Sequence, residues 1–199
     1  EAPTVRSTPA GDPPDLTAAG LVPADGLMFL AAHVSRARTL TEWMDASILD
    51  ESRPEDRHPE LDLYNPANPH QPPYSAAFIE RYRAAQVARN RRITAWVRGK
   101  LDDLRHRGRN ADEFGFVVHG TMADPRFLDP GIDPNDRKPR WCYLGEPQVV
   151  NNGPVGLARF CSLRSWLSQW SLEDSHADGE RCTARVQVPV LVVSNSADD

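Results

Sequence analysis

The sequence is poor in cysteine, has no basic excess and lacks long hydrophobic runs, and each shortage excludes a class of protein. Its three cysteines, Cys142, Cys161 and Cys182, are odd in number and lack metal-site spacing, so we expect reduced thiols of a cytoplasmic protein. No apolar run approaches membrane-spanning length and no charged-then-apolar leader opens the chain, which argues against a membrane protein. The net charge of −5 argues against general nucleic-acid binding, which needs a basic surface.

Metal and nucleotide motifs are also missing. The Asp-Pro pairs at 124–125, 129–130 and 133–134 invite a calcium site, but the Gly and the closing Glu of an EF-hand do not fall at the required offsets. Such pairs are common turn formers. No Gly-Lys-Ser/Thr accompanies the glycines at 145 and 153–156, which excludes a phosphate loop. We therefore expect neither a metal nor a cofactor.

Two short apolar runs, far apart in the chain, have the composition of strands. One lies within 25–33, after an Asp-Gly turn, and the other is Val-Pro-Val-Leu-Val-Val at 188–193. The second is mostly β-branched and nearly continuous, which is typical of a parallel strand buried on both faces. Pro189 lacks an N–H, so it belongs at the start of that strand. The run ends in small polar residues and carboxylates, where sites form in open α/β sheets.

Helical periodicity dominates the residues between these runs. Residues 34–49 place an apolar stripe on one face, and Ser75 can cap a long helix that continues to Gly108. A second amphipathic helix, 162–171, has a Trp-Leu-Trp face. Residues 114–120 form a short strand-like run, and the Pro-rich segments on either side of these elements are surface loops or flexible segments.

The long helix presents many arginines, including Arg89, Arg91 and Arg92. One interpretation is a face that binds an anion or an acidic partner. The other is a solvated face that pairs with the acidic loops around it. No aromatic side chains interleave with the arginines to stack on bases, and the chain is acidic, so we favour the second interpretation.

The segment 188–199 resembles the late strand of α/β-hydrolases, in which Pro-hydrophobic-Leu-hydrophobic-hydrophobic is followed by Gly-x-x-Asp. In that family the Asp is the acid of the catalytic triad, and the resemblance places it at Asp198. Asn195 stands where the family usually has Gly, and Asn also tolerates left-handed backbone angles. The neighbouring Asp199 is the competing carboxylate, and its alternative role is that of a solvated turn residue. The run at 25–33 resembles the sixth strand of the same family, and 188–193 resembles the seventh.

The resemblance implies an α/β fold class: a partial α/β-hydrolase fold, with late core strands of a parallel sheet and a large, mostly helical cap insertion. Residues 1–33 would form a linker and the sixth-strand part, residues 34–161 the cap, and residues 162–199 the return helix and the seventh strand, which ends at the acid turn. The resemblance covers most of this chain, but only the middle and late part of the family's pattern.

The implied activity is hydrolysis of a small-molecule ester or acyl substrate by a Ser-His-Asp mechanism. Residues of the return helix line the acyl pocket in this family, which makes Trp166 and Trp170 candidates, although a core position is the alternative. His33, at the end of the first strand, is a third candidate for substrate contact, with a structural role as its alternative.

The nucleophile and the base of such a triad have no candidates in the sequence. It contains no Gly-x-Ser-x-Gly, and no His follows Asp198. We therefore expect a fragment that is inactive as it stands, with the nucleophile before Glu1 and the base after Asp199. The alternatives are a non-catalytic hydrolase-like binding module, an interaction protein organised around the arginine-rich helix, and the same fold with another chemistry, such as dehalogenation.

Overall fold

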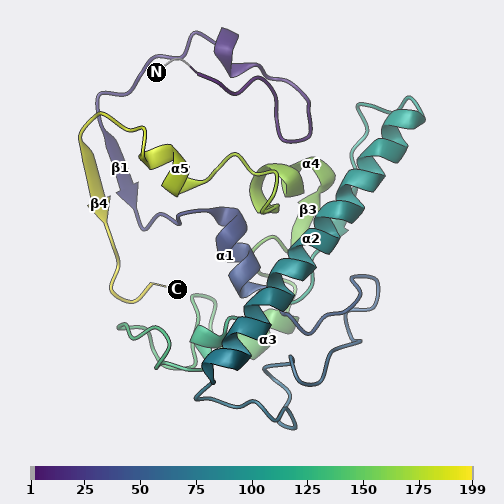
Figure 1. Ribbon diagram of the computed structural model, residues 1–199, viewed down its shortest axis with the longest axis vertical. Helices are drawn as coiled ribbons and strands as arrows, with labels where there is room; N and C mark the ends of the chain where they lie inside the picture. The colour runs from purple at the N-terminus through teal and green to yellow at the C-terminus, as the bar shows by residue number, and fades with distance from the viewer. Residues whose placement is uncertain (1–2, 199) are drawn as a thin grey trace.

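The computed structural model describes residues 3–198 of the 199-residue chain, and combines helices with two small sheets (Figure 1). A parallel pair joins β1 to β4, and an antiparallel pair joins β2 to β3. The elements in chain order are η1 (Leu16–Ala18), β1 (Leu27–Leu30), α1 (Arg36–Trp43), α2 (Ala76–His106), β2 (Gly115–Val117), η2 (Pro125–Phe127), α3 (Pro147–Asn152), β3 (Phe160–Ser162), α4 (Leu163–Ser165), η3 (Trp166–Trp170), α5 (Gly179–Thr183) and β4 (Val190–Val193).

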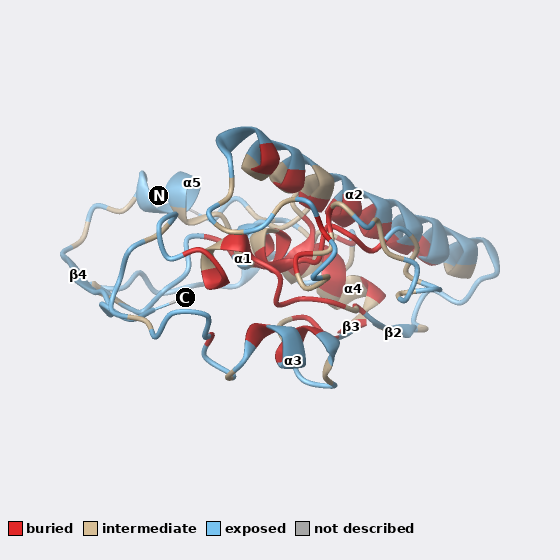
Figure 2. Cartoon of the chain, turned by 90° about the horizontal axis from the view of Figure 1, so that it is seen from below, coloured by how far each residue is buried: buried red, intermediate tan, exposed pale blue. Residues whose placement is uncertain are grey.

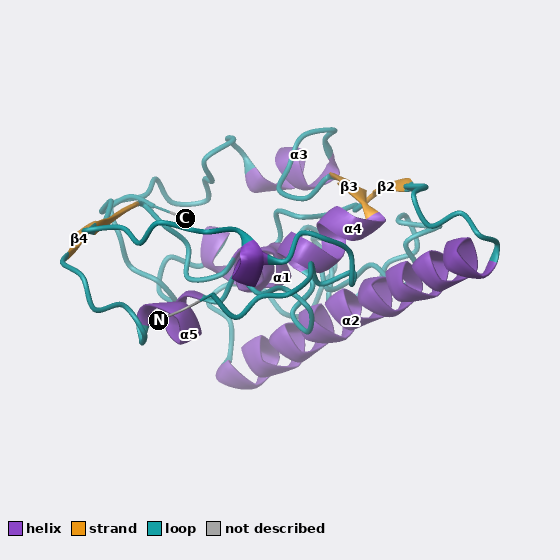
Figure 3. Cartoon of the chain, turned by 90° about the horizontal axis from the view of Figure 1, so that it is seen from above, coloured by secondary structure: helices purple, strands orange, loops and turns teal. Residues whose placement is uncertain are grey.

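The long helix α2 forms where the periodicity predicts it. The Ser75 side chain accepts a hydrogen bond from the backbone N–H of Phe78 at 3.2 Å, which satisfies one of the free donors of the first turn. The helix ends at His106, just before Gly108, whose φ of +71° suits glycine. It runs along one side of the molecule (Figure 3).

The helix expected over 34–49 is shorter than its apolar stripe. It ends at Trp43, because Met44 adopts extended backbone angles and the Asp45 side chain bonds to Ser47 instead. Side chains such as Asp offer the backbone this alternative to the helix. The stripe is nevertheless buried as expected, since Leu40, Trp43, Met44 and Ile48 all lie in the interior.

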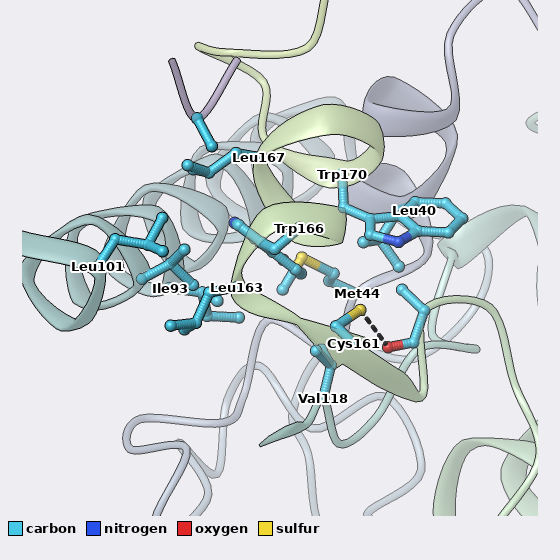
Figure 4. Close-up of a cluster of buried hydrophobic side chains, with 13 residues drawn as sticks. Leu40, Met44, Ile93, Leu101, Val118, Cys161, Leu163, Trp166, Leu167 and Trp170 are labelled. Atoms are coloured by element: carbon cyan, nitrogen blue, oxygen red, sulfur yellow. Dashed lines mark hydrogen bonds between the residues drawn. The ribbon is translucent and has the colours of Figure 1, made fainter. Parts of the chain in front are cut away.

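The helix expected over 162–171 divides into one turn of α-helix, α4, and the π-helix η3. Ser162 and Ser165 form a reciprocal capping box at its start. Its Trp-Leu-Trp face packs between α1 and α2 and forms the centre of the main core (Figures 2 and 4). The core members are Ala10, Leu40, Met44, Ile93, Val97, Leu101, Val118, Ala158, Cys161, Leu163, Trp166, Leu167 and Trp170.

The apolar strands β1 and β4 are exposed, although the sequence predicts that they are buried. The strands β1 and β4 lie at one end of the molecule, away from α2 (Figures 1 and 3), and Leu191 and Val192 are 53% and 65% exposed. All four residues of β4 are exposed. The prediction of strands buried on both faces is therefore wrong for the described residues 3–198. Its physical reason is that no helix of this part of the chain packs over the two-stranded sheet.

The antiparallel pair lies on the opposite side of the core, and β3 was not predicted. Its residues pair with the strand expected at 114–120, with Phe116 opposite Cys161. The proposed boundary between 161 and 162 falls inside β3.

The amino-terminal segment lies on the surface against α2 and α4, where Arg105 donates to the Ala10 carbonyl and Arg164 pairs with Asp12 at 2.7 Å.

Candidate functional site

The carboxyl edge of the parallel pair is where the candidate acid lies. The two strands are held in register, with the N–H of Leu27 donating to Pro189 and that of Ala31 to Val193, both at 2.9 Å. Ala31 has a φ of +47°, so β1 stops abruptly and the chain turns towards His33. Both chain segments that follow the strands, 31–34 and 194–198, thus emerge at the same edge.

A polar loop fixes the segment that follows β4. The N–H of Asp136 donates to the Ser196 carbonyl at 2.9 Å. The carbonyl of Asp198 accepts from Asn135 Nδ2 at 3.0 Å and from Arg137 Nη1 at 2.9 Å. These bonds hold the backbone of the candidate acid, and the residue itself is exposed. The loop therefore fixes the backbone at the candidate acid.

Aromatic rings connect this loop to the end of β1. The ring of Trp43 lies 6.2 Å from that of His33, 5.6 Å from that of Phe127 and 5.8 Å from that of Tyr143, between centroids. Arg137 stacks over Phe127 at 5.4 Å. His33 and Asp198 are thereby linked to one aromatic group, which we define as His33, Trp43, Phe127 and Tyr143. The Trp43 Nε1 is buried and has no hydrogen-bond partner among the described residues.

The two tryptophans predicted to line a substrate pocket lie elsewhere, on η3. Trp166 is fully buried, and its Nε1 donates to the Thr94 hydroxyl at 3.0 Å (Figure 4 shows its place in the core). Trp170 lies at the edge of the same core and lines a cavity of about 500 Å³. The structure thus brings His33 and Asp198 to one edge of the sheet, and places Trp166 and Trp170 in the core.

Apart from Arg92, the arginines of α2 pair with acidic residues of the surrounding loops and of the helix itself, as the second interpretation predicts in part, but not all of them are solvated. Arg89 is fully buried, and its Nη2 lies 2.6 Å from a carboxylate oxygen of Glu51. Arg83 pairs with the buried Asp124 at 2.9 Å. Further pairs are Arg81 with Glu60, Arg91 with Glu173, Arg98 with Glu173 and Asp174, Arg105 with Asp12 and Asp102, and Arg107 with Asp103.

A larger cavity, about 670 Å³ in volume, lies between α2 and β2. Trp96 and Phe116 form part of its apolar wall, and its polar lining residues include His119 and Glu51. Burial, followed by the charge of Arg159, lowers the pKa of His119 below its usual 6.5, so the ring is neutral at pH 7. A neutral imidazole beside an apolar wall suits a ligand that is largely apolar.

Metal ligands and thiols show no reactive grouping. Among residues 3–198, no three His, Cys, Asp or Glu side chains gather to hold a metal ion. No disulfide joins the three cysteines, and burial raises the pKa of Cys161 to about 12. A thiol of such high pKa is inert as a nucleophile. None of the described helices is long and apolar enough to cross a membrane.

Sequence reasoning missed the residues that hold the candidate acid in place. Asn135 and Arg137 belong to a region that its Asp-Pro pairs marked only as turns, and their partner lies far away in the chain. Trp43 carried a signal, since it belongs to the predicted apolar stripe, but nothing local indicated its contact with His33.

Comparison with protein-family profiles, with curated proteins and with solved structures gives no match for this chain.

Proposed function

We propose that this chain supplies the cap and the acid-bearing strand of an α/β-hydrolase that cleaves a small-molecule ester or acyl bond. One observation carries the proposal. The strands β1 and β4, separated by most of the sequence, pair in parallel and in register, and a carboxylate follows β4 at its carboxyl end. That is the place where open α/β sheets form their sites, and the long excursion between the strands is where a cap would be inserted.

The exposed sheet supports the same reading. Parallel sheets are stable with both faces covered, and a pair of strands alone is marginal. The side chains of Met28 and Leu30 are each 60% exposed, as are large parts of β4. In the proposed fold, further strands would pair at the two free edges, and helices would cover the faces. Additional polypeptide would supply them.

The proposed roles follow from position. Asp198 would accept a hydrogen bond from the catalytic imidazole, hold it in the tautomer that takes a proton from the nucleophile, and stabilise the imidazolium that forms. His33 and Trp170 would contact substrate from the strand end and from the return helix, and Trp166 belongs to the core cluster that includes Trp170. The nucleophile and the base would come from the additional polypeptide, since the sequence has no Gly-x-Ser-x-Gly and no His after Asp198.

The test is Asp198→Asn in the protein that carries this chain at its natural length. Hydrolysis of p-nitrophenyl esters should fall by about 10³- to 10⁴-fold in kcat, because an amide cannot hold the imidazole in the correct tautomer. The far-UV circular dichroism and the midpoint of unfolding should stay near the wild-type values. Asp199→Asn, at the neighbouring carboxylate that lies outside the described residues, is the matched control and should keep its turnover.

Unchanged turnover in the Asp198→Asn protein would reject the acid. A loss of turnover in Asp199→Asn instead would move the role to the competing carboxylate. A wild-type protein without turnover on a broad ester panel would favour the non-catalytic, hydrolase-like binding module, which the absence of a nucleophile motif in this sequence also suits.

A further inference from the structure

Arg92 is the arginine of α2 that has no carboxylate partner among residues 3–198. Its side chain is exposed, and its Nη2 donates to the Ile48 carbonyl at 2.9 Å. That bond holds one end of the guanidinium but leaves its charge unpaired. The other arginines of the helix each form an ion pair; they are Arg81, Arg83, Arg89, Arg91, Arg98 and Arg105.

The cavity of about 670 Å³ between α2 and β2 has Arg92 in its wall. Much of the remaining wall is apolar, formed by Leu49, Ile93, Trp96, Phe116, Val117 and Val118. Trp96 packs edge-to-face against Phe116, with ring centroids 5.1 Å apart, and is still 41% exposed. Leu49 is 54% exposed. Apolar surface that stays open to solvent around a cavity of this volume is typical of a small-molecule site.

The acidic residues of the wall already have partners. Both carboxylate oxygens of Glu51 accept from the buried Arg89, at 2.7 and 2.6 Å. Asp50 Oδ1 accepts from the N–H and the hydroxyl of Ser52, at 2.9 and 2.7 Å, and Asp50 Oδ2 lies 3.6 Å from Arg53. These carboxylates are therefore occupied, and a cationic ligand would have to compete with the protein for them.

The charges around His119 favour an anion in the same cavity. After burial, the pKa of this ring is lowered by Arg159, Arg89 and Arg57, and it is raised by Glu51 alone. The imidazole is thus neutral at pH 7, and it lies in a region where nearby arginines outnumber the acids that act on it. The unpaired charge that lines the cavity is the positive charge of Arg92.

We propose that this cavity binds a monocarboxylate with a flat aromatic body, the carboxylate at Arg92 and the rings against Trp96 and Phe116. A guanidinium forms charge-assisted bonds with a carboxylate, which are stronger than neutral hydrogen bonds. Aromatic side chains favour an aromatic body through ring packing in addition to the burial of apolar area. The inference does not rest on the proposed hydrolase, because it involves neither Asp198 nor the parallel pair of strands.

The test titrates sodium 2-naphthoate into the protein that carries this chain at its natural length, by isothermal titration calorimetry. Neutral 2-naphthamide and cationic 2-naphthylmethylamine are the comparison probes, and the naphthoate should bind more tightly than either. Arg92→Met keeps an aliphatic side chain and removes the charge, so naphthoate should bind it about tenfold more weakly. Binding of naphthamide should stay unchanged in this variant, which shows that the cavity is intact. Arg91→Met, at the neighbouring exposed arginine outside the cavity wall, is the matched control and should bind naphthoate like the wild type.

A second variant, Trp96→Leu, tests the aromatic part of the site. It should weaken naphthoate and naphthamide alike, by roughly three- to tenfold, because both lose the same ring contact. Trp141→Leu is its control, since Trp141 is also 41% exposed and lies outside the cavity wall.

Saturable binding of naphthoate that falls in Arg92→Met and in Trp96→Leu, and in neither control, supports the proposal. It is overturned if naphthoate does not bind saturably, or if Arg92→Met and Arg91→Met bind it equally well. Tighter binding of the amine than of the naphthoate overturns the anionic class of ligand. Equal binding by Trp96→Leu and Trp141→Leu overturns the placement in this cavity.

Discussion

At the scale of single residues, Gly120 joins two loops where a larger residue would not fit. Its φ is +55°, its carbonyl accepts the N–H of Asp45 at 2.8 Å, and a Cβ would lie 2.7 Å from the Asp45 Cβ and 2.8 Å from the Ile48 Cδ1. Both the backbone angle and the packing therefore require glycine. The opposite case is Gly99 in α2, where a Cβ would meet nothing within 4 Å.

Gly120→Ala should lower the free energy of unfolding by roughly 2–4 kcal/mol, because strain and overpacking act together. Gly99→Ala should raise it by about 0.5–1 kcal/mol through helix propensity. Urea denaturation followed by circular dichroism measures both. A Gly120→Ala protein as stable as the wild type would contradict the described packing.

The lowered pKa of His119 makes the stability of the folded protein depend on pH. Its pKa in the folded protein is below the 6.5 of an ordinary histidine, first because of burial and then because of Arg159. On acidification the unfolded chain therefore binds this proton before the folded one does. The contribution is fully present above about pH 6.5 and is lost as pH falls towards the folded pKa.

His119→Gln should flatten the fall in stability between about pH 7 and pH 5, measured as the urea midpoint at each pH. The exposed His176, replaced by Gln in the same way, should leave the wild-type slope intact. Equal slopes in all three proteins would show that His119 does not titrate differently on folding.

At the scale of elements, α2 carries two kinds of arginine that the sequence alone does not separate. Arg89 is buried, binds both carboxylate oxygens of Glu51 at 2.7 and 2.6 Å, and donates to the carbonyls of Asp45, His119 and Gly120. Arg91, two residues on, is largely exposed and pairs with Glu173 at 3.2 Å. Arg89 therefore connects the loops to the helix, whereas Arg91 forms a solvated ion pair on the surface.

Arg89→Ala should cost roughly 3–5 kcal/mol of stability, since it leaves a carboxylate and several carbonyls without their donor. Arg91→Ala should change stability by less than about 0.5 kcal/mol. Thermal unfolding of both variants in the same buffer tests the difference. Similar midpoints for the two would mean that Arg89 does not organise the loops.

The helices were predictable because their signals are local. Ser75 caps α2 as expected, and the Trp-Leu-Trp face of 162–171 is buried. The early end of α1 depends on the Asp45 side chain, which bonds to Ser47 and also accepts from Asn151, 106 residues away. Neither the π-helical turn nor β3 has a local signal, since both depend on packing against α1, α2 and β2.

At the scale of the whole molecule, two regions differ in how completely they are packed. The helical region around η3 has a continuous core, whereas the parallel pair exposes its apolar side chains (Figure 2). The composition of β1 and β4 predicted that these strands pair in parallel, but it did not predict that their side chains are exposed. The apolar pattern of these strands is typical of a sheet that helices cover on both faces, and residues 3–198 supply no such cover.

In the proposed fold, β1 and β4 are inner strands of a larger parallel sheet, and this claim is central to it. In the pair, β1 donates to the carbonyls of Pro189 and Val193, so the N–H groups of Val190 and Val192 point to the other edge of β4. Residue-resolved hydrogen exchange of these two amides, in the protein at its natural length, tests the claim. We expect strong protection, comparable with the core of α2, because a further strand would accept from them. Exchange at the rate of an unstructured chain would contradict the proposed fold and the hydrolase built on it.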